Sequence, residues 1–203
     1  MSSGTSATLR NEDWYEGALG TMGLTIGTAA AGYAVMKMNG RGQIGYVTGG
    51  TQSKICVVSR LAVNTMPTAL QDWKFHMGIS SGSNTNGITV TGSIMWYCSS
   101  SSPFWKMYSA SISGGIIMDM ASTIPVTTDA IVLGTWFPNN AGDCVYFYST
   151  DGGITYNIEH MFVRTANNYG GSPVIGATRV AGTTNTTTVD LDYIGISVRG
   201  ATI

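Results

Sequence analysis

The chain has 203 residues, and only 10% of them are charged, against about 25% in an ordinary soluble domain. Its 10 Lys or Arg and 11 Asp or Glu residues form no run of either sign, which excludes the electrostatic footprint of a nucleic-acid-binding protein. No segment approaches the roughly 18 consecutive apolar residues of a membrane span, and the first residues do not resemble a signal peptide. We therefore expect a soluble protein of one domain, with no nucleic-acid or membrane partner.

The N-terminal residues differ in composition from the rest of the chain. Residues 1–8 are small and polar, which predicts either a disordered tail or an arm that orders on a partner. An acidic stretch follows around Trp14 and Tyr15, which are either a docking contact or part of a strand that enters a sheet. We predict an anchoring arm over residues 1–20, with contact residues Leu9, Arg10, Trp14 and Tyr15, and a β-sandwich domain over residues 21–203.

The remaining chain is a series of short runs rich in β-branched and aromatic residues, separated by Gly, Ser, Asn or Pro. Residues 73–80, WKFHMGIS, alternate strictly, as a half-buried strand requires, with Trp73 on one face and His76 on the other. Residues 64–73 contain Pro67 and are expected to form a loop. Further strands are expected at 54–63, 87–98, 114–120, 130–137, 143–149 and 189–198. These runs predict an all-β, antiparallel fold.

The stretch STDGGITY resembles the Asp box, S-x-D-x-G-x-T-W/Y, of sialidases and other β-propellers. Its motif positions are occupied by Ser149, Asp151, Gly153, Thr155 and Tyr156. In that motif the Ser and Asp side chains hydrogen-bond to turn amides and lock a hairpin. A propeller needs one copy per blade, whereas this sequence has a single copy. We therefore predict a structural hairpin here.

Sequence patterns of catalysis are weak. Glycosidases need two carboxylates across the scissile bond, and the nearest candidates are Asp190 and Asp192, about 7 Å apart on one strand face unless a bulge separates them. No serine-nucleophile or phosphate-loop motif is present. The three cysteines are expected to be buried free thiols, and the two histidines lack zinc-ligand spacing. We predict that the chain is not an enzyme and that it needs no cofactor or metal.

The segments follow an order that resembles a known family. That order is residues 74–80, 94–98, 102–111, 128–138, 145–153 and 186–198. It looks like the concanavalin A-like (LamG-like) jelly-roll domains of tailed-bacteriophage virion proteins, over about residues 20 to 200. Members tend to carry a strand like F-R-I-G, an F-x-x-x-D-G hairpin and a C-terminal strand like V-D-Y-I. The resemblance implies an antiparallel two-sheet sandwich, made in the host cytoplasm and placed on the virion surface.

Two functions are compatible with this resemblance. The favoured one is a structural virion protein, a capsid decoration or head fibre, which self-associates as a homotrimer and contacts the major capsid protein or another virion protein. The alternative is a glycan-binding module of a tail fibre that recognises a host surface glycan through exposed aromatic residues. The predicted glycan contacts are Trp105, Phe104, Tyr108 and Tyr169, with Trp96, Tyr97 and Trp136 as further candidates. Trp105 could equally fill the core.

Calcium ligands of the lectin families do not transfer convincingly to this sequence. The carboxylates to consider are Asp119, Asp129 and Asp143, which lie in loops or at strand ends. Single carboxylates in such places are more often turn caps than metal ligands.

Overall fold

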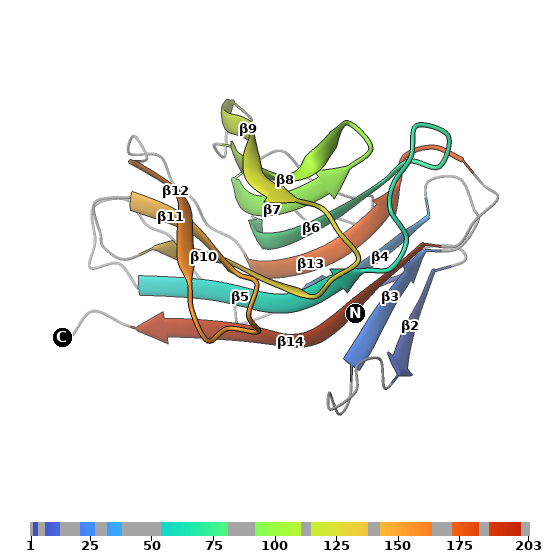
Figure 1. Ribbon diagram of the computed structural model, residues 1–203, viewed down its shortest axis with the longest axis horizontal. Helices are drawn as coiled ribbons and strands as arrows, with labels where there is room; N and C mark the ends of the chain where they lie inside the picture. The colour runs from blue at the N-terminus through green and yellow to red at the C-terminus, as the bar shows by residue number, and fades with distance from the viewer. Residues whose placement is uncertain are drawn as a thin grey trace.

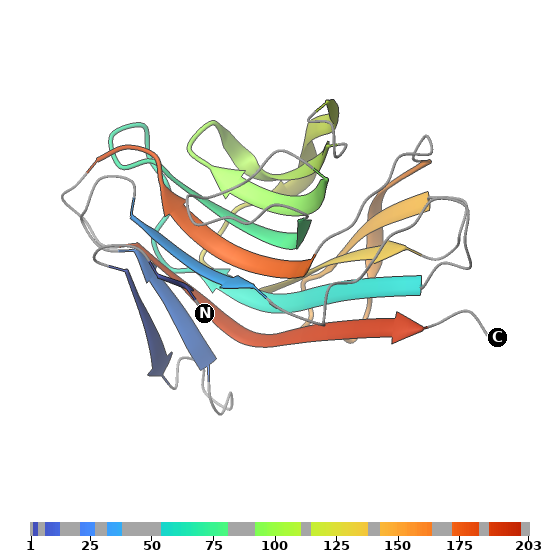
Figure 2. The same ribbon diagram turned by 180° about the vertical axis from the view of Figure 1, so that it is seen from behind.

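The computed structural model describes residues 2–3, 7–12, 21–26, 32–37, 54–80, 92–110, 115–137, 143–163, 172–182 and 187–199. These residues form two antiparallel sheets of seven strands each, stacked as a sandwich (Figures 1 and 2). Sheet A has the order β1 (Ser2–Ser3), β4 (Tyr33–Lys37), β13 (Ser172–Arg179), β6 (Trp73–Ser80), β7 (Ser93–Ser99), β8 (Ser102–Ala110) and β9 (Ile116–Pro125). Sheet B has the order β12 (Asn157–Val163), β11 (Asp143–Ser149), β10 (Ile131–Phe137), β5 (Lys54–Val63), β14 (Thr187–Arg199), β3 (Thr21–Ile26) and β2 (Ala7–Glu12). The predicted all-β, antiparallel two-sheet fold is confirmed.

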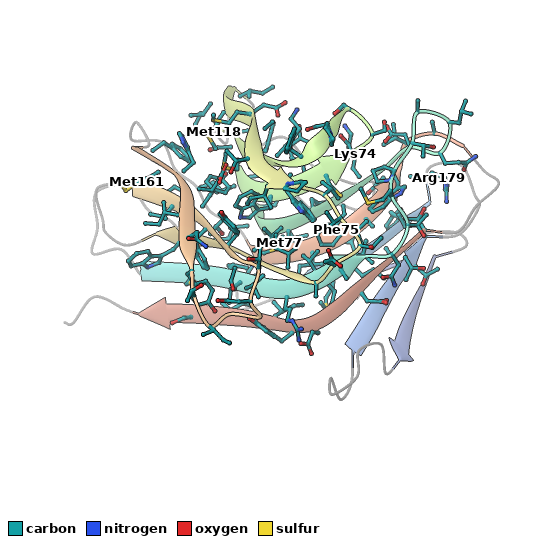
Figure 3. All side chains as sticks on the ribbon, viewed as in Figure 1. Lys74, Phe75, Met77, Met118, Met161 and Arg179 are labelled. Carbon is teal, nitrogen blue, oxygen red and sulfur yellow. The ribbon has the colours of Figure 1, made fainter. Side chains whose placement is uncertain are left out.

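The hydrophobic core lies between the two sheets. Trp73, Phe75 and Met77 of β6 point into it (Figure 3 labels the last two) and are fully buried. Two buried aromatic residues donate hydrogen bonds from one sheet to the other. Trp96 of sheet A donates from its indole Nε1 to the carbonyl oxygen of Gly134 in sheet B at 2.9 Å. Tyr146 of sheet B donates from its hydroxyl to the carbonyl oxygen of Tyr108 in sheet A at 2.7 Å. Each sheet therefore satisfies a polar group of the other, as buried polar atoms require.

Strand β6 differs from its prediction in one respect. The alternation is correct, but His76 and Ser80, on the face expected to meet solvent, are also buried, at 1% and 2% exposure. Residues 64–72 form the predicted loop, and no helix that could cross a membrane occurs among the described residues. Cys98 and Cys144 are buried, as predicted for all three cysteines, whereas Cys56 is only partly buried.

The described part of residues 1–20 lies within the sheets. Ser2–Ser3 pairs with β4, and Ala7–Glu12 pairs with β3, so that Leu9 lies opposite Leu24 and Arg10 opposite Gly23. These residues are strands of the sandwich, whereas Trp14 and Tyr15 lie outside the described residues. The division at residue 20 and the anchoring role stay predictions.

Candidate functional site

Polar and titratable side chains gather on the outer face of sheet A, the face turned away from sheet B. Antiparallel partners in register point to the same side of a sheet. One row of register partners crosses the sheet and consists of Val35, Gly176, His76, Tyr97, Lys106 and Ala121. The next row consists of Val174, Gly78, Met95, Tyr108 and Asp119. His76, Tyr97 and Lys106 thus lie side by side on three neighbouring strands.

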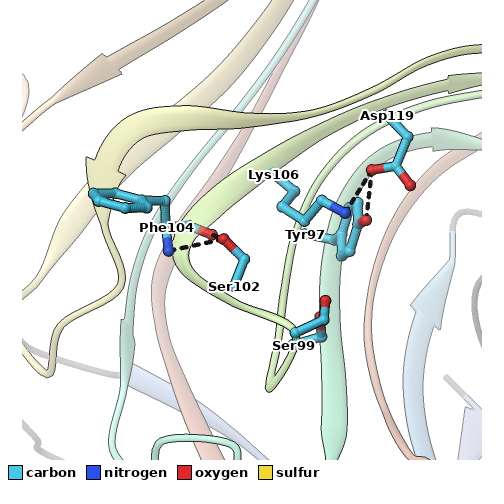
Figure 4. Close-up of polar contacts among 7 residues, drawn as sticks. Tyr97, Ser99, Ser102, Phe104, Lys106 and Asp119 are labelled. Atoms are coloured by element: carbon cyan, nitrogen blue, oxygen red, sulfur yellow. Dashed lines mark hydrogen bonds and ion pairs between the residues drawn. The ribbon is translucent and has the colours of Figure 1, made fainter.

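Tyr97, Lys106 and Asp119 form a connected polar cluster (Figure 4). The Tyr97 hydroxyl donates to Asp119 Oδ1 at 2.7 Å, and Lys106 Nζ lies 2.8 Å from the same oxygen. The ammonium group of Lys106 also lies 5.1 Å from the centroid of the Tyr97 ring. Tyr97 is only 8% exposed, whereas the Asp119 side chain is 37% exposed. A ligand approaching this face would therefore meet Asp119 and Lys106 before the tyrosine.

The surroundings shift the pKa values of this cluster. Burial, followed by the hydrogen bond to Asp119, raises the pKa of Tyr97 far above its usual value, so the phenol stays protonated. Desolvation acts to raise the pKa of Asp119, but the hydrogen bonds from Lys106 and Tyr97 outweigh it and the pKa lies below its usual value. At neutral pH the cluster therefore presents a hydroxyl donor and a carboxylate, with Lys106 Nζ beside the carboxylate. Perturbed titratable groups of this kind concentrate at functional sites.

His76 extends the cluster along the row. Its ring lies against the Cα of Gly176, since a Cβ placed there would be 2.9 Å from the ring Cε1. Neither ring nitrogen has a hydrogen-bond partner among the described residues. Burial lowers the pKa of His76 from 6.5 to about 4, so the imidazole is neutral at pH 7. His76 is thus a buried, neutral group that can both donate and accept a hydrogen bond.

Apolar side chains surround the polar row on the same face. They form a second cluster of buried residues, separate from the core between the sheets: Val35, Met95, Tyr97, Tyr108, Ala110 and Val174, with Tyr33 partly buried against them. Tyr97 and Tyr108 pack edge to face with ring centroids 6.2 Å apart. The outer face of sheet A therefore carries a buried aromatic and aliphatic cluster beside the polar row, and Asp119 is the most exposed member of the polar cluster.

The structure separates the predicted glycan contacts. Trp105 is 1% exposed and packs edge to face on Phe75 in the core, with ring centroids 6.0 Å apart, which is the alternative that the sequence left open. Phe104 is 39% exposed and lies apart from the Tyr97 cluster (Figure 4). Tyr108 is on the outer face of sheet A but only 5% exposed, and Tyr169 lies outside the described residues. Tyr108 is thus the one of these four that the described structure brings to the candidate site.

The other aromatic candidates also divide between the layers. Trp96 is fully buried between the sheets, and Trp136, on the outer face of sheet B, is 42% exposed. Tyr97 belongs to the polar cluster. The sequence contained one signal for that cluster, the alternation that placed His76 on the strand face opposite to Trp73. It could not show that Lys106 and Asp119 lie near His76, because local sequence does not determine which strands pair.

The Asp-box segment forms the predicted hairpin turn. Asp151 Oδ1 accepts hydrogen bonds from Ser149 Oγ at 2.6 Å and from the Ile154 amide at 3.0 Å. Asp151 Oδ2 accepts from Thr155 Oγ1 at 2.6 Å, and the Gly153 amide donates to Ser149 Oγ at 2.9 Å. These bonds lower the pKa of Asp151 below its usual range, the bond from Ser149 contributing most. Tyr156, the last residue of the motif, is 52% exposed and packs edge to face on Phe147.

The Asp190 and Asp192 carboxylates do not form a catalytic pair. The register shifts between Leu191 and Tyr193, which is the bulge that the sequence left open. Asp190 is buried and accepts a hydrogen bond from Asn64, whereas Asp192 forms an ion pair with Arg60 at 2.6 Å. Each carboxylate is thus used structurally.

The calcium candidates are also apart. Asp119 belongs to the Tyr97 cluster, and the backbone of Asp143 begins β11. Asp129 lines a cleft of about 670 Å³ between the β9–β10 connection and the Asp-box turn, together with Arg60 and Asp151. Within the described residues, no three His, Cys, Asp or Glu side chains come together as a metal site would require.

Comparisons with known proteins identify the architecture. No protein-family model and no curated protein matches the sequence. The endo-β-1,4-glucuronan lyase of the fungus Trichoderma reesei aligns with a TM-score of 0.61 and 12% identity, covering 98% of this chain and 88% of that chain. A seed lectin of Lotus tetragonolobus aligns with a TM-score of 0.55 and 10% identity, covering 98% and 95%. A carbohydrate esterase of the Shiga toxin-encoding bacteriophage phi24B aligns with a TM-score of 0.54 and 14% identity, covering 96% and 88%.

The prediction that the chain is not an enzyme is wrong. The lyase and the esterase are enzymes built on this sandwich, so the fold does not argue against catalysis. Carboxylate pairs, serine nucleophiles and phosphate loops can be recognised from sequence motifs. Proton transfer by His, Lys or Tyr depends on residues whose positions are set by strand pairing and leave no linear motif.

At these identities the likeness concerns the fold alone. The fold is shared over nearly the whole chain with a lectin, a lyase and an esterase. The chain has the concanavalin A-like jelly-roll sandwich that the sequence resemblance implied.

Proposed function

We propose that this protein binds carbohydrate on the outer face of sheet A. The observation that carries the proposal is the row His76, Tyr97 and Lys106 on adjacent strands, with Asp119 accepting from both Tyr97 and Lys106. The lectin and the two carbohydrate-active enzymes that share the fold add support.

The chemistry of this face suits a sugar. Sugar hydroxyl groups both donate and accept, and Asp119 offers an acceptor while Lys106 offers donors. The buried apolar side chains around them are at most 8% exposed, so contact with a sugar falls mainly on Asp119 and Lys106. Both charged groups are partly exposed, at 37% for the Asp119 side chain and 19% for Lys106. They can therefore exchange water for sugar hydroxyls without unfolding of the sheet.

The test is a screen of neutral and uronate oligosaccharides for binding, followed by calorimetry on the best ligand. Lys106→Met and Asp119→Asn should each weaken binding by about tenfold or more, because each removes a charge-assisted hydrogen bond. Asp129→Asn is the matched control, since that carboxylate lies in the β9–β10 connection and should leave affinity unchanged. The same mixtures should be assayed for new chain ends, which separates binding from cleavage. Retained affinity in both cluster variants would refute the proposed site.

The location of this protein on a phage particle is a separate proposal, which rests on the sequence resemblance. We propose that the chain is exposed on the virion of a tailed phage, as a capsid decoration, head fibre or tail module that self-associates. Quantitative mass spectrometry of purified particles tests this, because the copy number relative to the major capsid protein distinguishes decoration from fibre. Complete absence from particles would refute the virion location and leave carbohydrate binding untouched. Deleting residues 1–20 is a poor test of attachment, because Ala7–Glu12 is a strand of sheet B.

A further inference from the structure

The outer face of sheet B has the opposite character to that of sheet A. Two rows of register partners cross five neighbouring strands, β12, β11, β10, β5 and β14 (Figure 1). One row consists of Ile158, Phe147, Gly134, Val58 and Gly195. The other consists of Met161, Val145, Trp136, Cys56 and Ser197. Neither row contains a charged residue. We call these two rows, with the adjoining Tyr156, the sheet-B face.

Large apolar side chains on the sheet-B face are exposed. Ile158 is 67% exposed, Met161 62%, Tyr156 52% and Trp136 42%. Isolated exposed apolar residues are normal on a protein surface, but a contiguous patch marks an interaction site. Exposed aromatic residues and Met, in rows that contain no charged residue, are the composition typical of protein–protein interfaces.

The glycines of these rows let neighbouring side chains of the face lie over them. The Phe147 ring lies over Gly134, where a Cβ would be 2.1 Å from the ring. Beside it, a cleft of about 470 Å³ is lined by Cys56, Val58, Trp136, Val145, Phe147, Tyr156 and Ile158. Met161, next to Val145 in register, projects at the border of this cleft. The face therefore has both a hollow and protruding side chains, which a second copy can match.

Charged residues border the face, including Lys54 opposite Arg199 beyond the second row, and some of them have side-chain partners. Arg60 and Asp192 form an ion pair at 2.6 Å in the row beyond Gly134 and Val58. Glu159 of β12 turns toward β9, where Oε2 accepts from Thr123 Oγ1 at 2.8 Å. A two-fold interface brings each group near its own equivalent, so a charge at its centre would meet a like charge. A neutral apolar centre avoids that repulsion.

We infer that the sheet-B face is the surface through which two copies of this chain associate about a two-fold axis. The inference rests on the proposed self-association and names its surface. A single self-complementary face closes with two copies, so it gives a dimer rather than the trimer expected from the resemblance. A neutral sugar is the poorer occupant, because exposed Ile158 and Met161 offer no hydrogen bonds to its hydroxyl groups.

The test is the mass of the full chain in solution, measured by sedimentation over a concentration series. The wild type should approach twice the chain mass, and Ile158→Lys with Met161→Lys should return it to one chain mass. Leu70→Lys, in the exposed loop between β5 and β6 at 83% exposure, is the matched control and should stay dimeric. Because all three side chains are exposed, the variants should keep the wild-type circular dichroism spectrum and melting temperature under monomeric conditions.

A second readout follows Trp136 directly. Trp73, Trp96 and Trp105 are at most 1% exposed, so acrylamide quenching in the described part of the chain falls mainly on Trp136. Quenching should decrease as the protein is concentrated, and Trp136→Phe should abolish that change. A wild type that stays monomeric, forms trimers, or keeps its mass in the Ile158 and Met161 variant would overturn the inference. Protection of Trp136 by a neutral oligosaccharide in a monomeric protein would do the same. The outcomes that concern mass alone leave carbohydrate binding by sheet A untouched, whereas protection of Trp136 by a sugar would count against it as well.

Discussion

At the residue scale, Trp105 shows how a loop-like context can mislead. It follows a serine-rich stretch and Pro103, which suggested an exposed stacking residue. In the structure it begins the inward-facing positions of β8 and fills space beside Phe75, while its neighbour Phe104 faces solvent. Trp105→Ala should lower the free energy of unfolding by about 4 kcal/mol, the usual cost of truncating a buried aromatic residue. Phe104→Ala, measured by the same urea denaturation, should cost less than about 1 kcal/mol. Equal costs would contradict the assignment of Trp105 to the core.

His76 links stability to pH. Its pKa is about 4 in the folded protein and about 6.5 when unfolded, so the unfolded chain binds the proton more readily between these values. Stability should therefore fall as the pH is lowered from about 6.5 to about 4, by roughly 3 kcal/mol in all. His76→Met should flatten this part of the profile, measured by urea denaturation at each pH. His160→Gln, on edge strand β12, controls for the loss of a histidine. An unchanged slope in His76→Met would show that another group titrates.

Asp151 should act in a lower pH range. Its pKa is depressed in the folded turn, so its stabilising contribution is present above the unfolded value of about 3.9 and is lost as the pH falls below it. The melting temperature of the wild type should fall below about pH 4, and Asp151→Asn should fall less over the same range. Differential scanning calorimetry at several pH values checks this. A profile for Asp151→Asn that parallels the wild type would contradict the role assigned to the carboxylate.

At the scale of elements, the contact between β6 and β7 depends on Gly78. Its φ is +149°, and a Cβ there would lie 2.1 Å from the carbonyl oxygen of Ile94. Gly78→Ala should therefore cost about 3 kcal/mol through backbone strain and strand displacement. Gly152 also has a positive φ, +78°, but a Cβ there meets nothing within 4 Å, so Gly152→Ala should cost only about 1 kcal/mol. Urea denaturation of the two variants separates the cost of the steric clash with β7 from the cost of a positive φ. Equal losses of unfolding free energy would contradict the assigned role of Gly78.

The same scale shows what the sequence could and could not predict. Strands such as β6 and β11 are visible because alternation and turn residues are local properties. The change of face after Leu191 was harder to see, since a bulge displaces Asp192 without any change in composition. Burial on both faces of β6 could not be predicted, because a buried outer face requires other parts of the fold to cover it.

At the scale of the whole molecule, the sandwich separates two chemical surfaces. The outer face of sheet A carries Tyr97, Lys106 and Asp119, whereas the sheet-B face carries apolar side chains without charge. The all-β class and the jelly-roll order could be predicted from the sequence. The composition of each face could not, because His76, Tyr97 and Lys106 are separated along the chain and meet only through the pairing of β6, β7 and β8.

The most direct measurement of carbohydrate binding by sheet A is hydrogen–deuterium exchange with and without the best oligosaccharide from the screen. Bound sugar should slow exchange in β6, β7, β8 and β9, which carry His76, Tyr97, Lys106 and Asp119, and leave β10, β11 and β12 unchanged. Asp119→Asn should remove the protection at the same sugar concentration. Protection confined to sheet B, or no protection with any member of the panel, would contradict the account.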